Sequence, residues 1–122
     1  MRYACIIYYD PSKLFDQSPE ALSVLDECVT HDAKLRASGH FVTDAALELP
    51  EAAMTVHVRE GKMSAVDGPF METKEMLGGF IVIEARDLNE AVRVAAGIPQ
   101  ARLGFVEVRP VVADFSEPPP VL

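Results

Sequence analysis

The segment Arg2–Tyr9 (RYACIIYY) is apolar at almost every position, on both faces that an extended strand presents. Its two alternating sets are Tyr3, Cys5, Ile7 and Tyr9 on one side and Ala4, Ile6 and Tyr8 on the other. Successive side chains of a strand point to opposite faces of the sheet, so a strand of this composition needs cover on both sides. We therefore expect a sheet whose two faces are both at least partly shielded from water.

Two helix starts are marked by capping patterns. Ser18-Pro19-Glu20 combines a capping hydroxyl, a proline in the first turn and an acid near the positive end of the helix dipole. This pattern predicts a helix that runs to about Ser38 and is ended by Gly39. Its predicted apolar row is Leu22, Leu25, Val29 and Leu35, with Cys28 beside it. Asp87 followed by Glu90 predicts a second helix from Leu88 to about Gly97.

The other strands are read from alternation and from turn residues. The predicted strands are 41–49, 54–60, 63–66, 79–85 and 104–112, with a tight turn at Glu60-Gly61-Lys62 between the second and the third. The order β, α, β, hairpin, β, α, β predicts an α+β fold, a ferredoxin-like βαββαβ arrangement with an inserted β-hairpin. We expect one domain over residues 1–113 and an extended or loose proline-rich tail over 114–122.

In this architecture both helices cover one face of the sheet. Alternation assigns Ile81, Ile83, Val106 and Val108 to the helix side. The opposite face would carry Phe80, Val82, Glu84, Phe105, Glu107 and Arg109. A second copy of the chain would cover this partly apolar face, which predicts a homodimer with facing sheets and a cleft between them. The alternative is a monomer whose sheet is half wet.

Composition narrows the class of partner. The chain has 122 residues, 49% of them hydrophobic, and a formal net charge of -8, which argues against a nucleic-acid or anionic-membrane surface. Neither Cys5 nor Cys28 lies in a CxxC motif, and we interpret both as reduced thiols of a cytoplasmic protein. We see no signal peptide and no run approaching the ~20 apolar residues of a membrane span. His31, His40 and His57 lack metal-ligand spacing, so no metal or cofactor is expected.

The run Asp67-Gly68-Pro69-Phe70, continued by Glu72-Thr73-Lys74-Glu75, is the most distinctive loop. Asp67 is expected to accept hydrogen bonds from the backbone that follows it, as Asp does in turns. Glu72, Lys74 and Glu75 either form an ion-pair cluster that orders the loop or line a ligand pocket.

A second candidate group lies on the predicted hairpin. His57 and Arg59 share a strand face with Thr55, and together they could hold a small carboxylate or phosphate. The alternative is a solvated hairpin face. With the loop and the open sheet face, the candidate ligand-binding residues are His57, Arg59, Asp67, Glu72, Lys74, Glu84 and Arg109.

The first helix carries two further polar residues. His31 and Asp32 are adjacent and do not face each other on a helix, so they are not expected to act as a pair. Asp32 falls partly toward the core, which favours a half-buried, satisfied carboxylate over a catalytic base. His40 after Gly39 is interpreted as a cation at the helix end.

The loop with Leu77-Gly78-Gly79-Phe80 closely resembles the YCII-related proteins of the DGPF (DGPFAETKE) type. The resemblance extends to the first strand, to Glu60-Gly61-Lys62 and to the closing segment 106–111. It implies a dimeric α+β barrel, and relatives of this type are often associated with extracytoplasmic-function sigma factors. The chain departs from the family pattern at Met71, at Met76 and at His57, where Arg is expected.

Three functions stay open at this level. The first is a small dimeric binding or regulatory domain that accepts a polar metabolite between its sheets. The second is a cofactor-independent isomerase, lyase or oxygenase-like enzyme in the same cleft. The third is an interaction module for a sigma-factor-type regulator.

Overall fold

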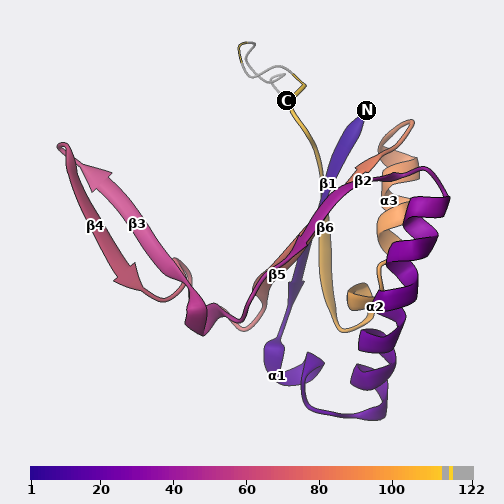
Figure 1. Ribbon diagram of the computed structural model, residues 1–122, viewed down its shortest axis with the longest axis horizontal. Coiled ribbons are helices and arrows are strands. Elements are labelled where there is room, and N and C mark those ends of the chain that lie inside the picture. The colour runs from indigo at the N-terminus through magenta and orange to yellow at the C-terminus, as the bar shows by residue number, and fades with distance from the viewer. Residues whose placement is uncertain (114–115, 117–122) are drawn as a thin grey trace.

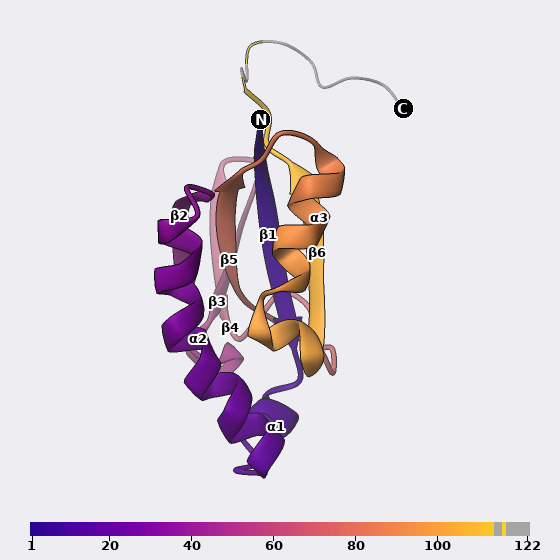
Figure 2. The ribbon, with the colours of Figure 1, turned by 90° about the vertical axis from the view of Figure 1, so that its right-hand side faces the viewer.

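The computed structural model describes residues 1–113 and 116, and its centre is a four-stranded antiparallel sheet (Figure 1). Its strands are β1 (Arg2–Tyr9), β2 (Phe41–Ala46), β5 (Met76–Glu84) and β6 (Gly104–Pro110), in the order β2-β5-β1-β6. Helices α2 (Pro19–Ala37) and α3 (Leu88–Ala96) lie side by side over one face (Figure 2). This is the α+β, ferredoxin-like arrangement that the element order predicts, and β1 lies inside the sheet between β5 and β6.

The inserted hairpin stands apart from this sheet. It consists of β3 (Met54–Arg59) and β4 (Lys62–Asp67), which pair with each other in a separate two-stranded sheet. Figure 1 shows this hairpin projecting from one end of the main sheet, on the side away from the helices. We call residues 54–67 the arm.

The hydrophobic core lies between β1, β5 and the helices. Tyr3, Cys5 and Ile7 of β1 are buried there against Ile83 of β5 and Ala91 of α3. The residues assigned to the helix side take part: Ile83 is fully buried, and Ile81, Val106 and Val108 pack against the core. The other face of the main sheet, which we call the open face, has no helix over it (Figure 1).

The cap of α2 is confirmed, but two residues of its predicted apolar row are wrong. Ser18 accepts a hydrogen bond from the Ala21 amide at 3.1 Å, as expected. Leu22 and Val29 are exposed, Val29 by 75%. The helix instead turns Ala21, Val24 and Leu35 to the core, with Leu25 and Cys28 partly buried.

Four other elements differ from expectation. Pro11–Leu14 form a short helix, α1, capped by the Asp10 carboxylate, which accepts from the Ser12 amide at 2.9 Å. The strand predicted over 41–49 ends at Ala46, and a short 3₁₀ turn, η1, follows it at Pro50–Ala52. A second 3₁₀ turn, η2, follows α3 at Pro99–Arg102.

The predicted tail 114–122 lies outside the described residues, apart from Ser116. None of the helices in the described ranges is long and apolar enough to cross a membrane.

The start of β6 depends on a glycine. A Cβ placed on Gly104 would lie well inside van der Waals contact of the Tyr8 carbonyl oxygen, which belongs to the backbone of the central strand. Gly97, after α3, has an ordinary φ of -83°, and a Cβ there would lie no closer than 3.4 Å to a neighbouring atom.

Gly104→Ala should therefore lower the free energy of unfolding by about 1–3 kcal/mol, because the β1 backbone cannot move cheaply. Gly97→Ala should be neutral or stabilising by up to about 1 kcal/mol, because it removes freedom only from the unfolded chain. Urea denaturation of both variants measures the change in the free energy of unfolding. Equal changes in the two variants would contradict the close packing of Gly104 against the β1 backbone.

Candidate functional site

A cavity of about 360 Å³ lies between α2 and the sheet, and we call it the helix cavity. Its walls are mostly apolar, and its polar groups come from four elements. The residues with polar or ionisable side chains that line it are Tyr9, Cys28, His31, Asp32, Asp44 and Gln100.

Local structure brings these groups together. Leu25, Cys28 and Asp32 lie three and four positions apart on α2 and therefore share one side of the helix. Tyr9 enters from the end of β1, and its ring packs edge-on against Phe15 at 6.0 Å between centroids. A Cβ on Gly78 would overlap the Tyr9 ring, so this glycine leaves the space that the ring occupies.

Burial favours the neutral form of three cavity groups, Cys28, Tyr9 and His31. It raises the pKa of the Cys28 thiol, and the neighbouring Glu27 carboxylate raises it further. It also raises the pKa of the Tyr9 hydroxyl, and it lowers the pKa of the His31 imidazole. At neutral pH the cavity therefore presents a thiol, a phenol and an uncharged imidazole, which suits hydrogen bonding and proton transfer better than thiolate chemistry.

Asp32 is half-buried and paired, as its position predicts. Its carboxylate accepts a hydrogen bond from Arg36 Nε at 3.0 Å, one helical turn later. The Arg36 guanidinium also lies 3.9 Å above the centre of the Phe41 ring. Asp32 is thus held in place at the cavity wall by a partner that is itself fixed.

The loop that follows the arm borders a second cavity. We call residues 67–75 the DGPF loop, and the cavity of about 710 Å³ beside it the loop cavity. Its lining is chiefly apolar and includes Tyr8 and Leu77 of the open face. Phe70 of the loop is 84% exposed, so the aromatic residue of the motif does not fill the core of this protomer.

The hydrogen bonds of the DGPF loop differ from the prediction. Within the described part of the chain, Asp67 accepts none from the backbone that follows it. Thr55 instead donates its hydroxyl to the Gly68 carbonyl at 2.8 Å, and the Gly68 amide donates to the Ala53 carbonyl at 2.7 Å. The base of the arm therefore orders the loop, and the Asp67 turn that we predicted is wrong.

The predicted ion-pair cluster in the loop is also wrong. Among the described residues, Lys74 forms no ion pair with Glu72 or Glu75. Glu72 and Lys74 line a shallow groove beside Asp10. Hydrogen bonding from Ser12 lowers the pKa of Asp10, and the Lys74 charge contributes to that shift.

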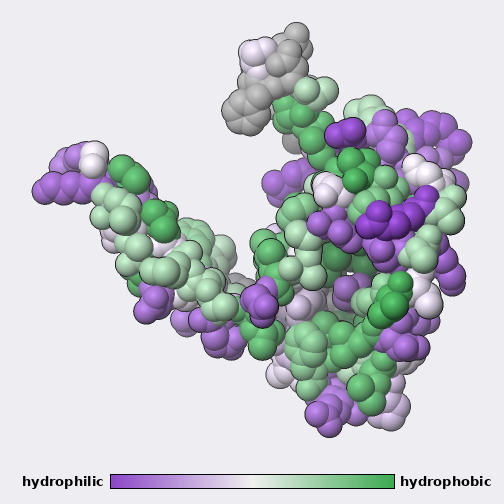
Figure 3. Space-filling view, viewed as in Figure 1, coloured by the Kyte–Doolittle hydropathy of each residue, from purple (hydrophilic) through white to green (hydrophobic). Residues whose placement is uncertain are grey.

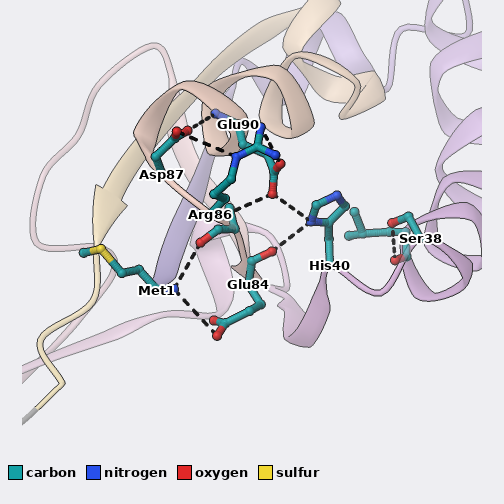
Figure 4. A network of polar contacts seen from close by, with 9 residues as sticks. Met1, Ser38, His40, Glu84, Arg86, Asp87 and Glu90 are labelled. Carbon is teal, nitrogen blue, oxygen red and sulfur yellow. Dashed lines mark hydrogen bonds and ion pairs between the residues drawn. The ribbon is translucent and has the colours of Figure 1, made fainter.

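The other candidate residues lie in separate places. His57 and Arg59 share the Thr55 face of the arm, opposite Ser64 and Lys62, and line neither the helix cavity nor the loop cavity. Arg109 donates to Glu107 at 2.5 Å on the open face. Glu84 lies 3.7 Å from the amino group of Met1 (Figure 4). One protomer thus does not assemble the seven predicted residues into a single site.

His40, which we predicted as a helix-end cation, also makes contacts with elements far from it in the sequence. Its Nδ1 lies 2.8 Å from the Glu84 carbonyl oxygen and 3.9 Å from the Glu90 carboxylate (Figure 4). It therefore links the start of β2 to β5 and to α3, and its role is structural.

Sequence reasoning missed the helix cavity. Cys28 was interpreted as a core thiol, and Tyr9 only as part of a buried strand face. Asp44 was not considered. Phe41 pairs with Ile83 and Asp44 pairs with Ile81, both helix-side residues, because the register shifts between Phe41 and Thr43. Simple alternation from Phe41 would have placed Asp44 on the opposite face. No grouping of three His, Cys, Asp or Glu side chains that could hold a metal ion occurs among the described residues.

Comparisons with known proteins agree with this fold. The structure is similar to 5-chloro-2-hydroxyhydroquinone dehydrochlorinase from Burkholderia phenoliruptrix AC1100, in complex with 2,5-dihydroxybenzoquinone. The TM-score is 0.54 at 15% identity, over 97% of this chain and 100% of that chain. An uncharacterised protein of Rhizobium meliloti (strain 1021) is 36% identical over 118 residues, covering 91% of this chain and 92% of that protein. The family model of the YCII-related domain matches residues 1–116. The chain therefore belongs to the YCII-related family.

Proposed function

We propose that this protein binds a small molecule in the helix cavity, as a binding domain with a regulatory or accessory role. One observation carries the proposal: apolar walls there surround a phenol, a thiol and an imidazole that are all neutral at neutral pH. Small-molecule sites commonly combine such walls with a few polar groups that orient the ligand.

The cavity favours a compact, mainly apolar ligand with one or two polar substituents, such as a hydroxylated aromatic ring. Its volume of about 360 Å³ lies near the lower end of ligand pockets. The solved protein of similar fold is described with 2,5-dihydroxybenzoquinone, a ring of this class. At 15% identity the likeness shows a shared fold and no shared binding residues. We therefore use that compound only as a guide to the size of the compounds to test.

From the sequence alone, we predicted that a polar metabolite binds between two facing sheets. On the open face, Glu107 and Arg109 are bound to each other, which leaves their charges already satisfied. The helix cavity offers more groups for orienting a ligand, and for that reason we locate the site there.

An acid–base enzyme in the same cavity is the second candidate. A neutral His31 imidazole can accept a proton from a ligand hydroxyl, and the Tyr9 phenol can donate one. The raised pKa of Cys28 makes covalent catalysis by its thiol the weaker form of this alternative.

A panel of hydroxylated benzenes and quinones tests the binding site. At least one compound should raise the melting temperature of the wild-type chain, because a ligand that binds only the folded state stabilises it. Cys28→Met places two more heavy atoms in the cavity and removes the thiol, so it should reduce or abolish that shift. Val29→Met adds the same side chain at the neighbouring, exposed position and should leave the shift unchanged.

The bound compound should also slow alkylation of Cys28 by iodoacetamide. The assignment to the helix cavity fails if no compound in the panel stabilises the chain. It fails equally if the shift is unchanged in Cys28→Met.

His31 should make stability fall in mild acid. Burial places its pKa below the ordinary value of 6.5; the smaller effect of the Asp32 charge opposes this shift, and the Lys34 charge adds to it. The unfolded chain therefore binds the proton more tightly than the folded one. The stability from a neutral His31 is present above that ordinary value and is lost as pH falls through it toward the folded-state pKa.

Urea denaturation at about pH 7.5 and about pH 5.5 measures this loss. His31→Gln should reduce the difference between the two conditions, because glutamine does not titrate. If the variant and the wild-type chain lose the same stability between the two pH values, burial of His31 does not cause the loss.

A further inference from the structure

The loop cavity continues into the shallow groove beside Asp10, which we call the polar groove. The volume of the polar groove is about 720 Å³. The residues that line both spaces are Pro50, Pro69, Thr73 and Met76. Because the two spaces share this wall, they form one continuous depression beside the DGPF loop, which we call the loop depression. One elongated molecule can therefore occupy both parts.

The end of the depression formed by the loop cavity suits an apolar group. Leu47, Leu49 and Leu77 line it, and they are 43%, 44% and 45% exposed. Figure 3 shows hydrophobic residues on the side of the body that faces the arm and along the arm itself, on either side of a hollow. Removing such apolar surface from water favours binding in proportion to the area covered. The volume of about 710 Å³ lies within the range of small-molecule pockets.

A nearly buried carboxylate lines the other end. Asp10 is 8% exposed, and its Oδ1 accepts hydrogen bonds from the Ser12 amide at 2.9 Å and from the Ser12 hydroxyl at 2.7 Å. Its Oδ2 accepts none from the described residues. No side-chain oxygen among those residues is both fully enclosed and without a partner, so Oδ2 still reaches open space. Since Asp10 lines the polar groove, this oxygen is left for a donor that enters there.

The charges of the loop depression favour a cation as that donor. Hydrogen bonding from Ser12 lowers the pKa of Asp10, so its carboxylate is ionised at neutral pH. Lys74 is the one cationic residue that lines the depression within the described part of the chain. The carboxylates that line it without an ion pair to a described residue are Glu48, Glu51, Glu72 and Glu75. An anionic ligand would therefore meet one ammonium group among five carboxylates, whereas a cation is attracted.

We propose that the loop depression binds an amphipathic cation. An ammonium group of the ligand donates to Asp10 Oδ2 in the polar groove, and its apolar body lies in the loop cavity. This site is distinct from the helix cavity, because Tyr8 lines the depression and Tyr9, which points to the opposite face of β1, lines the helix cavity. The two sites favour different ligands, a charged amphipathic amine here and an uncharged ring there.

An NMR titration of the full ¹⁵N-labelled chain with octylamine tests the site. The amine should shift the amide signals of residues 47–53 and 68–76. Its dissociation constant should be at least about tenfold lower than that of octanoate, because the carboxylates that attract the amine repel the acid. Octanol has the same apolar body and no charge, so its affinity should lie between the two.

Asp10→Asn separates the charge of Asp10 from its role as a helix cap. Asparagine caps helices as well as aspartate does, so α1 should stay intact. The variant should bind octylamine about tenfold more weakly, because the ammonium group loses its charged acceptor, and octanol as before. Asp16→Asn is the matched control. Asp16 also accepts a hydrogen bond from a backbone amide, that of Ser18 at 2.8 Å, but it lines neither part of the depression, so octylamine affinity should not change.

Leu49→Ala tests the apolar end. It should weaken octylamine and octanol alike, by about threefold or more, since both bury the same alkyl chain. Leu22→Ala, at an exposed position of α2, should weaken neither.

Three results would overturn the proposal. Equal affinities for octylamine and octanoate would show that the depression does not select a cation. Unchanged octylamine affinity in Asp10→Asn would show that Asp10 does not hold the ammonium group. Amide shifts confined to the helix cavity, at Cys28 and His31, would place the amine in the wrong site, and no shift with any of the three compounds would leave the depression without this ligand.

Discussion

The central position of β1 is the constraint on which the rest of the molecule depends. This strand pairs with β5 on one side and with β6 on the other, and its side chains alternate between two apolar environments. Tyr3, Cys5 and Ile7 meet the helices, and Ile6 and Tyr8 meet the open face. A charged residue among Tyr3, Cys5 and Ile7 would be buried without water in the layer under the helices, whereas the open face has no helix over it.

The sequence predicts best those features of the fold that depend on residues next to each other in the chain. The caps at Ser18 and Asp87 are local, and both helices begin where these residues predict. The rotation of α2 depends on contacts with the sheet, and Leu22 and Val29 were for this reason assigned to the wrong side. The start of α1 is marked locally as well, since Asp10 is a capping acid followed by Pro11, but we did not predict this helix.

The candidate site was harder to predict for the same reason. The DGPF loop is conspicuous in the sequence, yet its charged side chains form no cluster, and the loop is held by Thr55 and Ala53 at the base of the arm. The helix cavity is assembled from residues that each look ordinary alone. Tyr9, Cys28 and Asp44 come from three elements, and only their packing makes a pocket with neutral polar groups. Sequence patterns could not place them together, and the register shift in β2 keeps simple alternation from placing Asp44 on the helix side.

The alternation of β1 also separates the two cavities. Tyr9 lines the helix cavity, whereas Tyr8, its neighbour in the chain, lines the loop cavity beside the open face. The separation is not complete, because Leu47, which follows β2, lines both cavities. A Cβ on Gly78 would overlap the Tyr9 ring, and a Cβ on Gly104 would meet the Tyr8 carbonyl oxygen. A change at either glycine would therefore displace a residue that lines a cavity through its backbone or its ring, whereas a change at Cys28 acts directly on the helix cavity.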